Sequence, residues 1–141
     1  MESGNWIEEL YIAEYVPFNE EKVLSSHTDD YVCEDVARGV VVRGIANFIA
    51  FLKEFFSAFT DYNVEVISSF ASGDRACIEY TWTGTHTGNL PGLPATGKSV
   101  SLRTVEVWEL REGKISKASM YYDQVTMLQQ LGVMPPPPGP R

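Results

Sequence analysis

The chain has 141 residues, 44% of them hydrophobic and 21% charged, and carries a formal net charge of −8. This length suits a single domain with one core and one pocket. The negative charge argues against a nucleic-acid partner, because binding to a phosphate backbone depends on clustered Lys and Arg. The acidic start, MESGNWIEEL, lacks the basic and apolar regions of a secretory signal, and no apolar run is long enough to cross a bilayer. We therefore expect a cytoplasmic protein without a membrane partner.

Two short helices are predicted at the start of the chain. Apolar and aromatic residues fall on one helical face over residues 6–15, and Pro17 ends that helix. Asn19 is a suitable N-cap for the short helix that follows it. The segment 27–44 is rich in turn residues, so we expect an irregular connection there with one short strand at 40–42.

A longer helix and four strands follow. The helix has one apolar stripe at helical spacing, formed by Ile45, Phe48, Ile49, Leu52, Phe55, Phe56 and Phe59. After Asp61 the pattern changes to strands, which are YNVEVISSF, ACIEYTWTGTH, SVSLRTVEVWEL and KISKASMYYD. A final amphipathic helix over 125–131 ends at Gly132, and the proline-rich end over 133–141 is expected to form an extended tail.

Helices followed by strands are typical of an α+β fold with a mostly antiparallel sheet. The expected order within a single domain over residues 1–132 is two helices, a strand, a helix, four strands and a helix. A strongly curved sheet closed by the long helix would enclose a concave apolar pocket.

Residues 92–99, GLPATGKS, match the P-loop pattern G-x-x-x-x-G-K-[ST]. A working P-loop opens into a helix whose N-terminus holds the phosphate, whereas the residues after Ser99 alternate as in a strand. Pro91 and Pro94 also remove backbone donors that a phosphate cradle needs. We therefore interpret the segment as a connection between strands that shapes the rim of a pocket.

Asp123 and His86 are the candidate acid/base residues. Asp123 ends the last strand among aromatic and apolar neighbours, where desolvation would raise its pKa toward neutrality. An Asp at this boundary equally suits the N-cap of the following helix. His86 ends the second long strand and shares a face with Tyr80 and Trp82, so it could orient a carbonyl or relay a proton. The alternative for a lone His at a strand end is a hydrogen bond to a loop.

Other polar side chains are candidates for the lining of the pocket. Glu106 and Glu109 lie on opposite faces of the third long strand, so at most one of them points into a pocket and the other should be solvated. Tyr15, with Tyr121 and Tyr122, offers hydroxyls to a polar group on an otherwise apolar ligand, although most such tyrosines only pack.

The sequence predicts no metal site. His27 and Asp29 have no third ligand clustered with them, and Cys33 and Cys77 lack the CxxC spacing of a zinc site. The two cysteines are expected to be small buried residues instead.

Several segments resemble a known family. These are GTHTGNLPGLPATGK before a strand, then REGKI, then D-x-x-x-x-L-x-Q-L-G near the C-terminal end, with HTDDYV after the second helix. They are similar to the SnoaL-like polyketide cyclase (ester cyclase) group of the nuclear transport factor 2-like superfamily, over roughly residues 5–132. The resemblance implies a cone-shaped α+β barrel with a deep apolar cavity, dimerisation through the open sheet face, and ring closure of aromatic polyketides by intramolecular aldol condensation without a cofactor.

The same resemblance implies roles for single residues. Asp123 matches the acid/base aspartate of the family, His86 matches the His at the strand end, and Tyr15 matches a tyrosine late in the first helix. Where the characterised cyclases have a pocket Asn and a His, this sequence has Cys33 and Glu109, so the polar lining differs.

We predict a cofactor-independent acid/base enzyme that acts on a small apolar carbonyl compound. Asp123 would take a proton from the carbon next to a carbonyl, and His86 or Tyr15 would stabilise the enolate. The substrate would contact Tyr15, Trp82, Tyr80, Cys33, Glu106, Glu109 and Tyr121. The alternative is a non-catalytic binding or dimerisation module with the same cavity, in which Asp123 is a helix cap. An epoxide hydrolase or isomerase would need a second carboxylate facing Asp123, supplied by Glu106 or Glu109.

Overall fold

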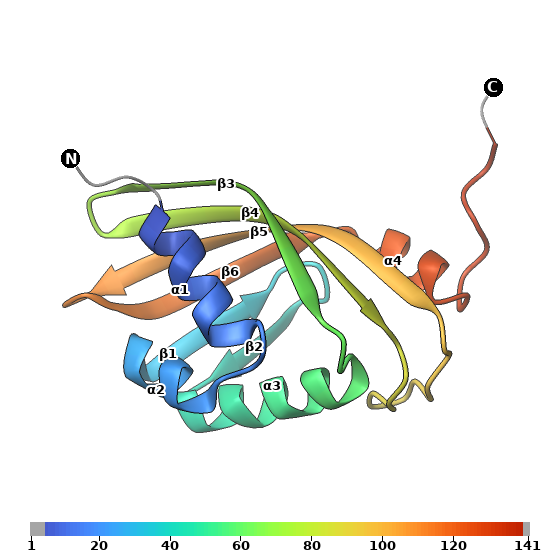
Figure 1. The fold of residues 1–141 in the computed structure, drawn as a ribbon, viewed down its shortest axis with the longest axis horizontal. Helices are drawn as coiled ribbons and strands as arrows, with labels where there is room; N and C mark the ends of the chain where they lie inside the picture. Colours follow the sequence, from blue (N-terminus) through green and yellow to red (C-terminus); the bar gives the residue numbers. More distant parts are fainter. Residues whose placement is uncertain (1–4, 140–141) are drawn as a thin grey trace.

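Residues 5–139 are described by a computed structural model of the protein, and this part of the chain contains four helices and six strands. In chain order they are α1 (Asn5–Tyr15), α2 (Glu20–Ser26), β1 (His27–Asp35), β2 (Val40–Arg43), α3 (Ile45–Ala58), β3 (Asn63–Ser72), β4 (Arg75–Thr85), β5 (Ser99–Arg111), β6 (Lys114–Tyr122) and α4 (Gln124–Gln130). The sheet curves around one side, where α1, α2 and α3 lie, and α4 sits at the far end (Figure 1).

All six strands belong to one sheet, in the order β2-β1-β6-β5-β4-β3. Neighbouring strands are antiparallel except β1 and β6, which run parallel. The pairing of β3 with β4 shifts between Val66 and Ser68, which leaves Ile67 as an extra residue in β3. A bulge of this kind bends a strand and increases its twist. It therefore adds to the curvature that gives the sheet a concave face.

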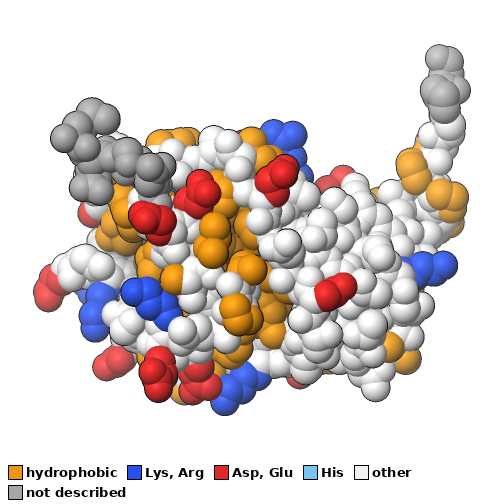
Figure 2. Space-filling model, in the orientation of Figure 1, with side chains coloured by type: hydrophobic (Ala, Val, Ile, Leu, Met, Phe, Trp, Pro, Cys, Tyr) orange, Lys and Arg blue, Asp and Glu red, His pale blue; other side chains and the backbone are white. Residues whose placement is uncertain are grey.

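Helix α3 covers the concave face with the apolar stripe that the sequence predicts. Phe48, Ile49 and Leu52 are buried, and burial of such a side chain contributes roughly 1.5–3 kcal/mol to stability. On the facing sheet the buried residues alternate along the strand, as Ile78, Tyr80 and Trp82 do in β4. The core thus lies between this helix and the inner face of the sheet. Figure 2 shows further hydrophobic side chains as a band across the face that carries α1 and β3.

The fold class predicted from the sequence is confirmed, and one element was predicted wrongly. The segment 27–35 is strand β1 and not an irregular connection. Tyr31, Cys33 and Asp35 are buried, whereas Glu34 between two of them is less so. A Cys and an Asp at inward positions hide the alternation of apolar and polar residues by which a strand is recognised.

The C-terminal end has no regular structure where it is described, since residues 135–139 belong to no helix or strand. Residues 1–4, and residues 140–141 of the predicted tail, lie outside the described part of the chain. Of the helices that are described, none combines the length and the apolar composition needed to cross a membrane.

Candidate active site

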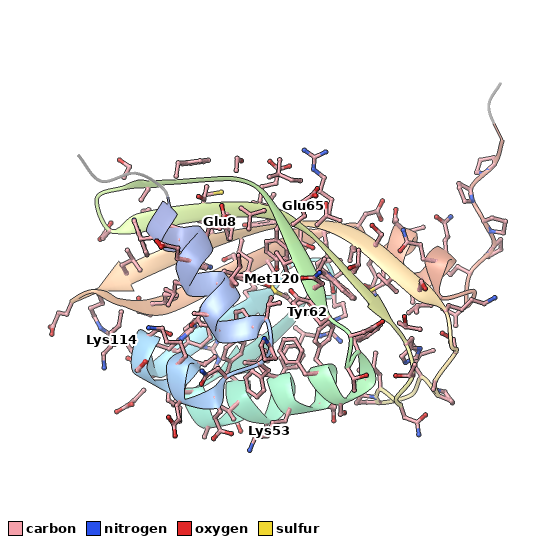
Figure 3. All side chains as sticks on the ribbon, viewed as in Figure 1. Glu8, Lys53, Tyr62, Glu65, Lys114 and Met120 are labelled. Carbon is pink, nitrogen blue, oxygen red and sulfur yellow. The ribbon has the colours of Figure 1, made fainter. Side chains whose placement is uncertain are left out.

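A cavity of about 720 Å³ lies between the concave face of the sheet and helices α1, α3 and α4. Sites for small molecules in proteins commonly enclose roughly 300–1,000 Å³. Aromatic and aliphatic side chains form most of its wall, and its exposed border includes Val40, Glu54, Pro91 and Val133. Tyr62 and Met120 lie in this interior, whereas Lys53 and Lys114 point away from it (Figure 3). The cavity is therefore large enough for an apolar ligand of several rings.

Glu106 on β5 places a carboxyl in the wall of this cavity although it is only 8% exposed. The hydroxyl of Tyr80 donates to its Oε2 at 2.5 Å, and the indole Nε1 of Trp108 donates to its Oε1 at 3.0 Å. Burial raises the pKa of Glu106, and the hydrogen bonds from Tyr80 and Trp108 offset only part of that rise. A buried carboxyl with a raised pKa at a cavity wall is a candidate for proton transfer to and from a ligand.

Tyrosine hydroxyls surround Glu106. Tyr11 on α1 and Tyr62, just before β3, share a hydrogen bond of 2.7 Å between their hydroxyls. The rings of Tyr11 and Tyr80 lie 4.7 Å apart between centroids, so Tyr11 adjoins the Tyr80 that binds Glu106. The hydroxyl of Tyr15 has no hydrogen-bond partner among the described residues although the side chain lines the cavity. Tyr15 is thus free to donate to a ligand.

A second carboxyl, Asp35 at the end of β1, also lines the cavity and is 4% exposed. Arg38 donates to it from Nε at 2.7 Å and from its backbone N–H at 3.2 Å, and Tyr122 donates its hydroxyl at 2.8 Å. Sequence reasoning missed this carboxyl because the strand that carries it was predicted as irregular. Its spacing of two from Cys33 and four from Tyr31 was the signal that could have revealed it.

The cavity brings together six of the residues that the sequence analysis selected, namely Tyr15, Cys33, Tyr80, Trp82, Glu106 and Tyr122. Burial raises the pKa of Cys33 to about 12, so its thiol stays protonated and acts as a small apolar group. Whether these residues contact a substrate stays a prediction.

Asp123 does not line the cavity. Its side chain is exposed and caps α4, accepting from the backbone N–H groups of Val125 at 3.0 Å and Thr126 at 3.3 Å and from the Thr126 hydroxyl at 2.9 Å. These bonds, with that from the Thr126 hydroxyl first, lower the pKa of Asp123. The expectation of a desolvated carboxyl with a raised pKa is therefore wrong, because the side chain turns back toward the start of α4. The N-cap alternative describes it correctly.

His86 is fully buried, yet it lies outside the cavity lining. Its Nδ1 accepts from the backbone N–H of Thr96 at 3.2 Å and lies 3.0 Å from the Thr96 hydroxyl, and its ring stacks on Phe59. Burial lowers the pKa of His86. His86 therefore holds the loop between β4 and β5 in place. This agrees with the alternative given above, a hydrogen bond from a strand-end His to a loop. The same loop places Pro91 and Gly92 at the border of the cavity, as predicted for a rim.

Glu109 and Tyr121 belong to the outer, convex face of the sheet. Glu109 pairs with Arg75 on one side and Lys117 on the other, and Tyr121 is 48% exposed. Since successive strand residues point to opposite faces, Tyr122 is the tyrosine that enters the cavity. The prediction that only one of Glu106 and Glu109 faces a pocket holds, with Glu106 inside.

A further buried cluster joins α1, α2 and β1 behind Tyr15. Glu14 is fully buried, accepts from the Ser26 hydroxyl at 2.5 Å and lies 3.4 Å from Nδ1 of His27. Burial raises the pKa of Glu14 to about 8 and lowers that of His27 to about 4. Both groups are therefore neutral at pH 7. Within residues 5–139, no group of three or more His, Cys, Asp or Glu side chains is placed to hold a metal ion.

Comparison with known families gives one match over most of the chain. The family model described as SnoaL-like polyketide cyclase matches residues 8–131. None of the curated proteins matches the chain in sequence.

Solved structures share the fold. A SnoaL-like protein from Jannaschia sp. CCS1, proposed to be a polyketide cyclase, gives a TM-score of 0.82 at 20% identity over 92% of this chain and 90% of its own. AclR from Streptomyces galilaeus, proposed to be a hydroxylase, gives a TM-score of 0.79 at 25% identity over 96% of this chain and 87% of its own. IdmH from Streptomyces antibioticus, proposed to be a polyketide cyclase, gives a TM-score of 0.72 at 23% identity over 89% of this chain and 97% of its own. At these identities the likeness shows the architecture, which agrees with the predicted one.

Proposed function

Because the chain belongs to the SnoaL-like polyketide cyclase family, we propose that it is a cofactor-independent enzyme that transfers protons on a small apolar carbonyl compound. The reaction is an intramolecular aldol cyclisation or a related isomerisation. The observation that supports this function is the carboxyl of Glu106, which is buried, has a raised pKa and lines a mostly apolar cavity. It takes the acid/base role that the sequence analysis gave to Asp123.

Glu106 begins the reaction as a carboxylate. It removes a proton from the carbon next to a substrate carbonyl, and the electron pair of the broken C–H bond moves into the enolate. The enolate oxygen accepts a hydrogen bond from the hydroxyl of Tyr15, which has no partner within residues 5–139. Because the surrounding wall is largely apolar, the hydrogen bond acts at a low local dielectric and is stronger than in water.

Ring closure follows within the same molecule. The enolate carbon attacks a second carbonyl carbon of the substrate, so that a C–C bond forms and the second oxygen becomes an alkoxide. The protonated Glu106 gives its proton to that alkoxide and returns to the carboxylate. The concave wall of the cavity contributes by holding a flexible substrate in the conformation for ring closure, which lowers the entropic cost of cyclisation.

Hydrogen exchange on a ketone probe tests the role of Glu106 without knowledge of the substrate. We would incubate 2-tetralone in D₂O with the protein and follow deuterium incorporation at the α carbons by NMR. The wild-type protein should exceed the buffer rate, and Glu106→Gln should lower its exchange rate at least about 100-fold. Asp123→Asn, which alters a carboxyl outside the cavity, should retain the wild-type rate. Loss of exchange in Asp123→Asn but not in Glu106→Gln would refute the assignment.

A non-catalytic binding module is the second candidate, and the N-cap role of Asp123 favours it because that residue matches the family's acid/base group. Such a module would bind 2-tetralone in the cavity without accelerating exchange. Its affinity for the probe would be the same in Glu106→Gln and wild type.

We also propose that the protein forms a homodimer through the convex face of the sheet. One row of paired residues crosses this face from Phe70 to Cys77, Val107 and Ser119. Phe70 is 63% exposed, and Tyr121 on the same face is 48% exposed. Large exposed apolar side chains grouped on one face support an interface.

A further inference from the structure

Arg38 stands at the border of the cavity in the turn between β1 and β2. Its side chain is 39% exposed and also lines the cavity, so it faces both solvent and any bound ligand. Its guanidinium lies over the ring of Phe51, with 5.9 Å from Cζ to the ring centroid. Together with the bond to Asp35, this contact orients the guanidinium.

Most of the donors of Arg38 are left for a ligand. A guanidinium carries five N–H groups. Nε is used by Asp35, and Tyr122 lies close enough to interact with the same guanidinium. The remaining Nη hydrogens have no other partner among the described residues. Among the described residues that line the cavity, Arg38 alone has a cationic side chain.

Asp35 holds this arginine and does not itself offer a site. Its Oδ1 accepts from the Arg38 backbone, and its Oδ2 accepts from both Arg38 Nε and the Tyr122 hydroxyl. Because a buried carboxylate with these partners is already satisfied, its role is to orient the guanidinium. Glu54, the other acidic residue at the border, is exposed, and water screens its charge.

The strand pairing sets the distance between Glu106 and Asp35, the carboxylate that holds Arg38. Asp35 and Glu106 are both paired with Met120, from opposite sides of β6. Their Cα atoms are thus two strand spacings apart, roughly 10 Å. The side chains of Asp35, Met120 and Glu106 point to the concave face and line the cavity.

We propose that Arg38 binds a carboxylate of the substrate through its free Nη hydrogens, while the reacting carbonyl lies at Glu106. The substrate is then an elongated apolar acid whose carboxylate and reacting carbonyl lie on the two sides of β6, near Asp35 and Glu106. A planar guanidinium with two parallel N–H groups suits a carboxylate better than a single carbonyl oxygen. The inference rests on the proposed function because it places the reacting carbonyl at Glu106.

Binding of matched probes tests the proposal. We would titrate the protein with anthracene-2-carboxylate and with its methyl ester and follow the fluorescence of the probe. The wild-type protein should bind the acid at least about tenfold more tightly than the ester, because the carboxylate gains charge-assisted hydrogen bonds. Arg38→Gln should remove this preference. Arg103→Gln is the matched control, since Arg103 also pairs with a carboxylate, that of Glu79, but lies outside the cavity lining.

A second variant keeps the test valid if Arg38→Gln fails to fold, which would follow from leaving the buried Asp35 without its partner. The double variant Asp35→Asn with Arg38→Gln removes both charges and should also bind acid and ester equally. Retention of the preference in either folded variant would overturn the proposal, as would a wild-type protein that binds the acid no better than the ester. Glu106→Gln should keep the preference for the acid whatever its rate of hydrogen exchange. Binding therefore tests the role of Arg38, and exchange separately tests the proposed function of Glu106.

Discussion

Replacing Glu14 by Gln should reduce the loss of stability that the wild-type protein undergoes as the pH rises above 6.5. Burial raises the pKa of Glu14 from 4.5 to about 8, so the folded state holds a proton that the unfolded chain has released. The resulting stabilisation is complete below pH 4.5 and is lost as the pH rises through about 8. Gln has the shape of the protonated carboxyl, can still accept from Ser26, and does not titrate.

The pKa difference sets the size of the effect. From 4.5 to about 8, at 1.36 kcal/mol per pKa unit, the full contribution is about 5 kcal/mol. About 2 kcal/mol of it is lost between pH 6.5 and 8.5. His27 acts in the opposite sense, because burial lowers its pKa from 6.5 to about 4 and its contribution is lost as the pH falls. The range above pH 6.5 therefore avoids most of the His27 contribution, and the contribution of Glu106, whose pKa burial also raises, cancels in the difference between Glu14→Gln and wild type.

Urea unfolding monitored by tryptophan fluorescence, at fixed protein concentration and at several pH values in this range, measures the effect. The difference in unfolding free energy between Glu14→Gln and wild type should grow by about 2 kcal/mol in favour of the variant as the pH rises to 8.5. Glu9→Gln, an exposed position on the same helix, should show no such trend. If Glu14→Gln loses stability with pH as steeply as wild type, Glu14 is ionised in the folded protein and the reasoning from burial is refuted.

Three further outcomes are expected. Tyr80→Phe removes a hydrogen bond that holds the pKa of Glu106 down, so the pH at which exchange of 2-tetralone reaches half its maximum should rise; an unchanged or lower value would contradict the role of Glu106 as base. Gly88→Ala would bring a Cβ against the carbonyl oxygen of Ser57 and should destabilise the protein by about 1–3 kcal/mol in urea unfolding. An unchanged unfolding midpoint would mean that the loop between β4 and β5 moves to accept the Cβ. Wild type should be a dimer and Phe70→Glu a monomer in light scattering after gel filtration if the proposed interface is right. A Phe70→Glu dimer would exclude the convex face as the interface.

The sequence predicted the elements whose pattern is local. The apolar stripe of α3 repeats at helical spacing, and the residues of β4 alternate strictly, so each could be recognised from its own period. The same alternation showed that Glu106 and Glu109 lie on opposite faces of β5. Strand β1 was not recognised from the sequence because its inward residues include Cys33 and Asp35, which give no alternation of apolar and polar residues.

The site was harder to predict because its polar residues meet only across the sheet. Asp35 and Glu106 are 71 positions apart in the sequence. They become neighbours of Met120 through the parallel pairing of β1 with β6 and the antiparallel pairing of β5 with β6. Nothing local marks Tyr11 and Tyr62 as hydrogen-bond partners. The orientation of Asp123 was likewise open, since a strand end and a helix start coincide there and both roles suit an Asp.

By itself, then, the sequence determined the fold class, the family and the alternation of each long strand, because these depend on spacings of a few residues. Only the tertiary structure decided which carboxyls face the cavity, that Asp123 caps a helix, and that burial raises the pKa of Glu106 and Glu14. Burial and partners depend on strand order and on the curvature of the sheet. Residues far apart in the chain set both, and no local pattern records them.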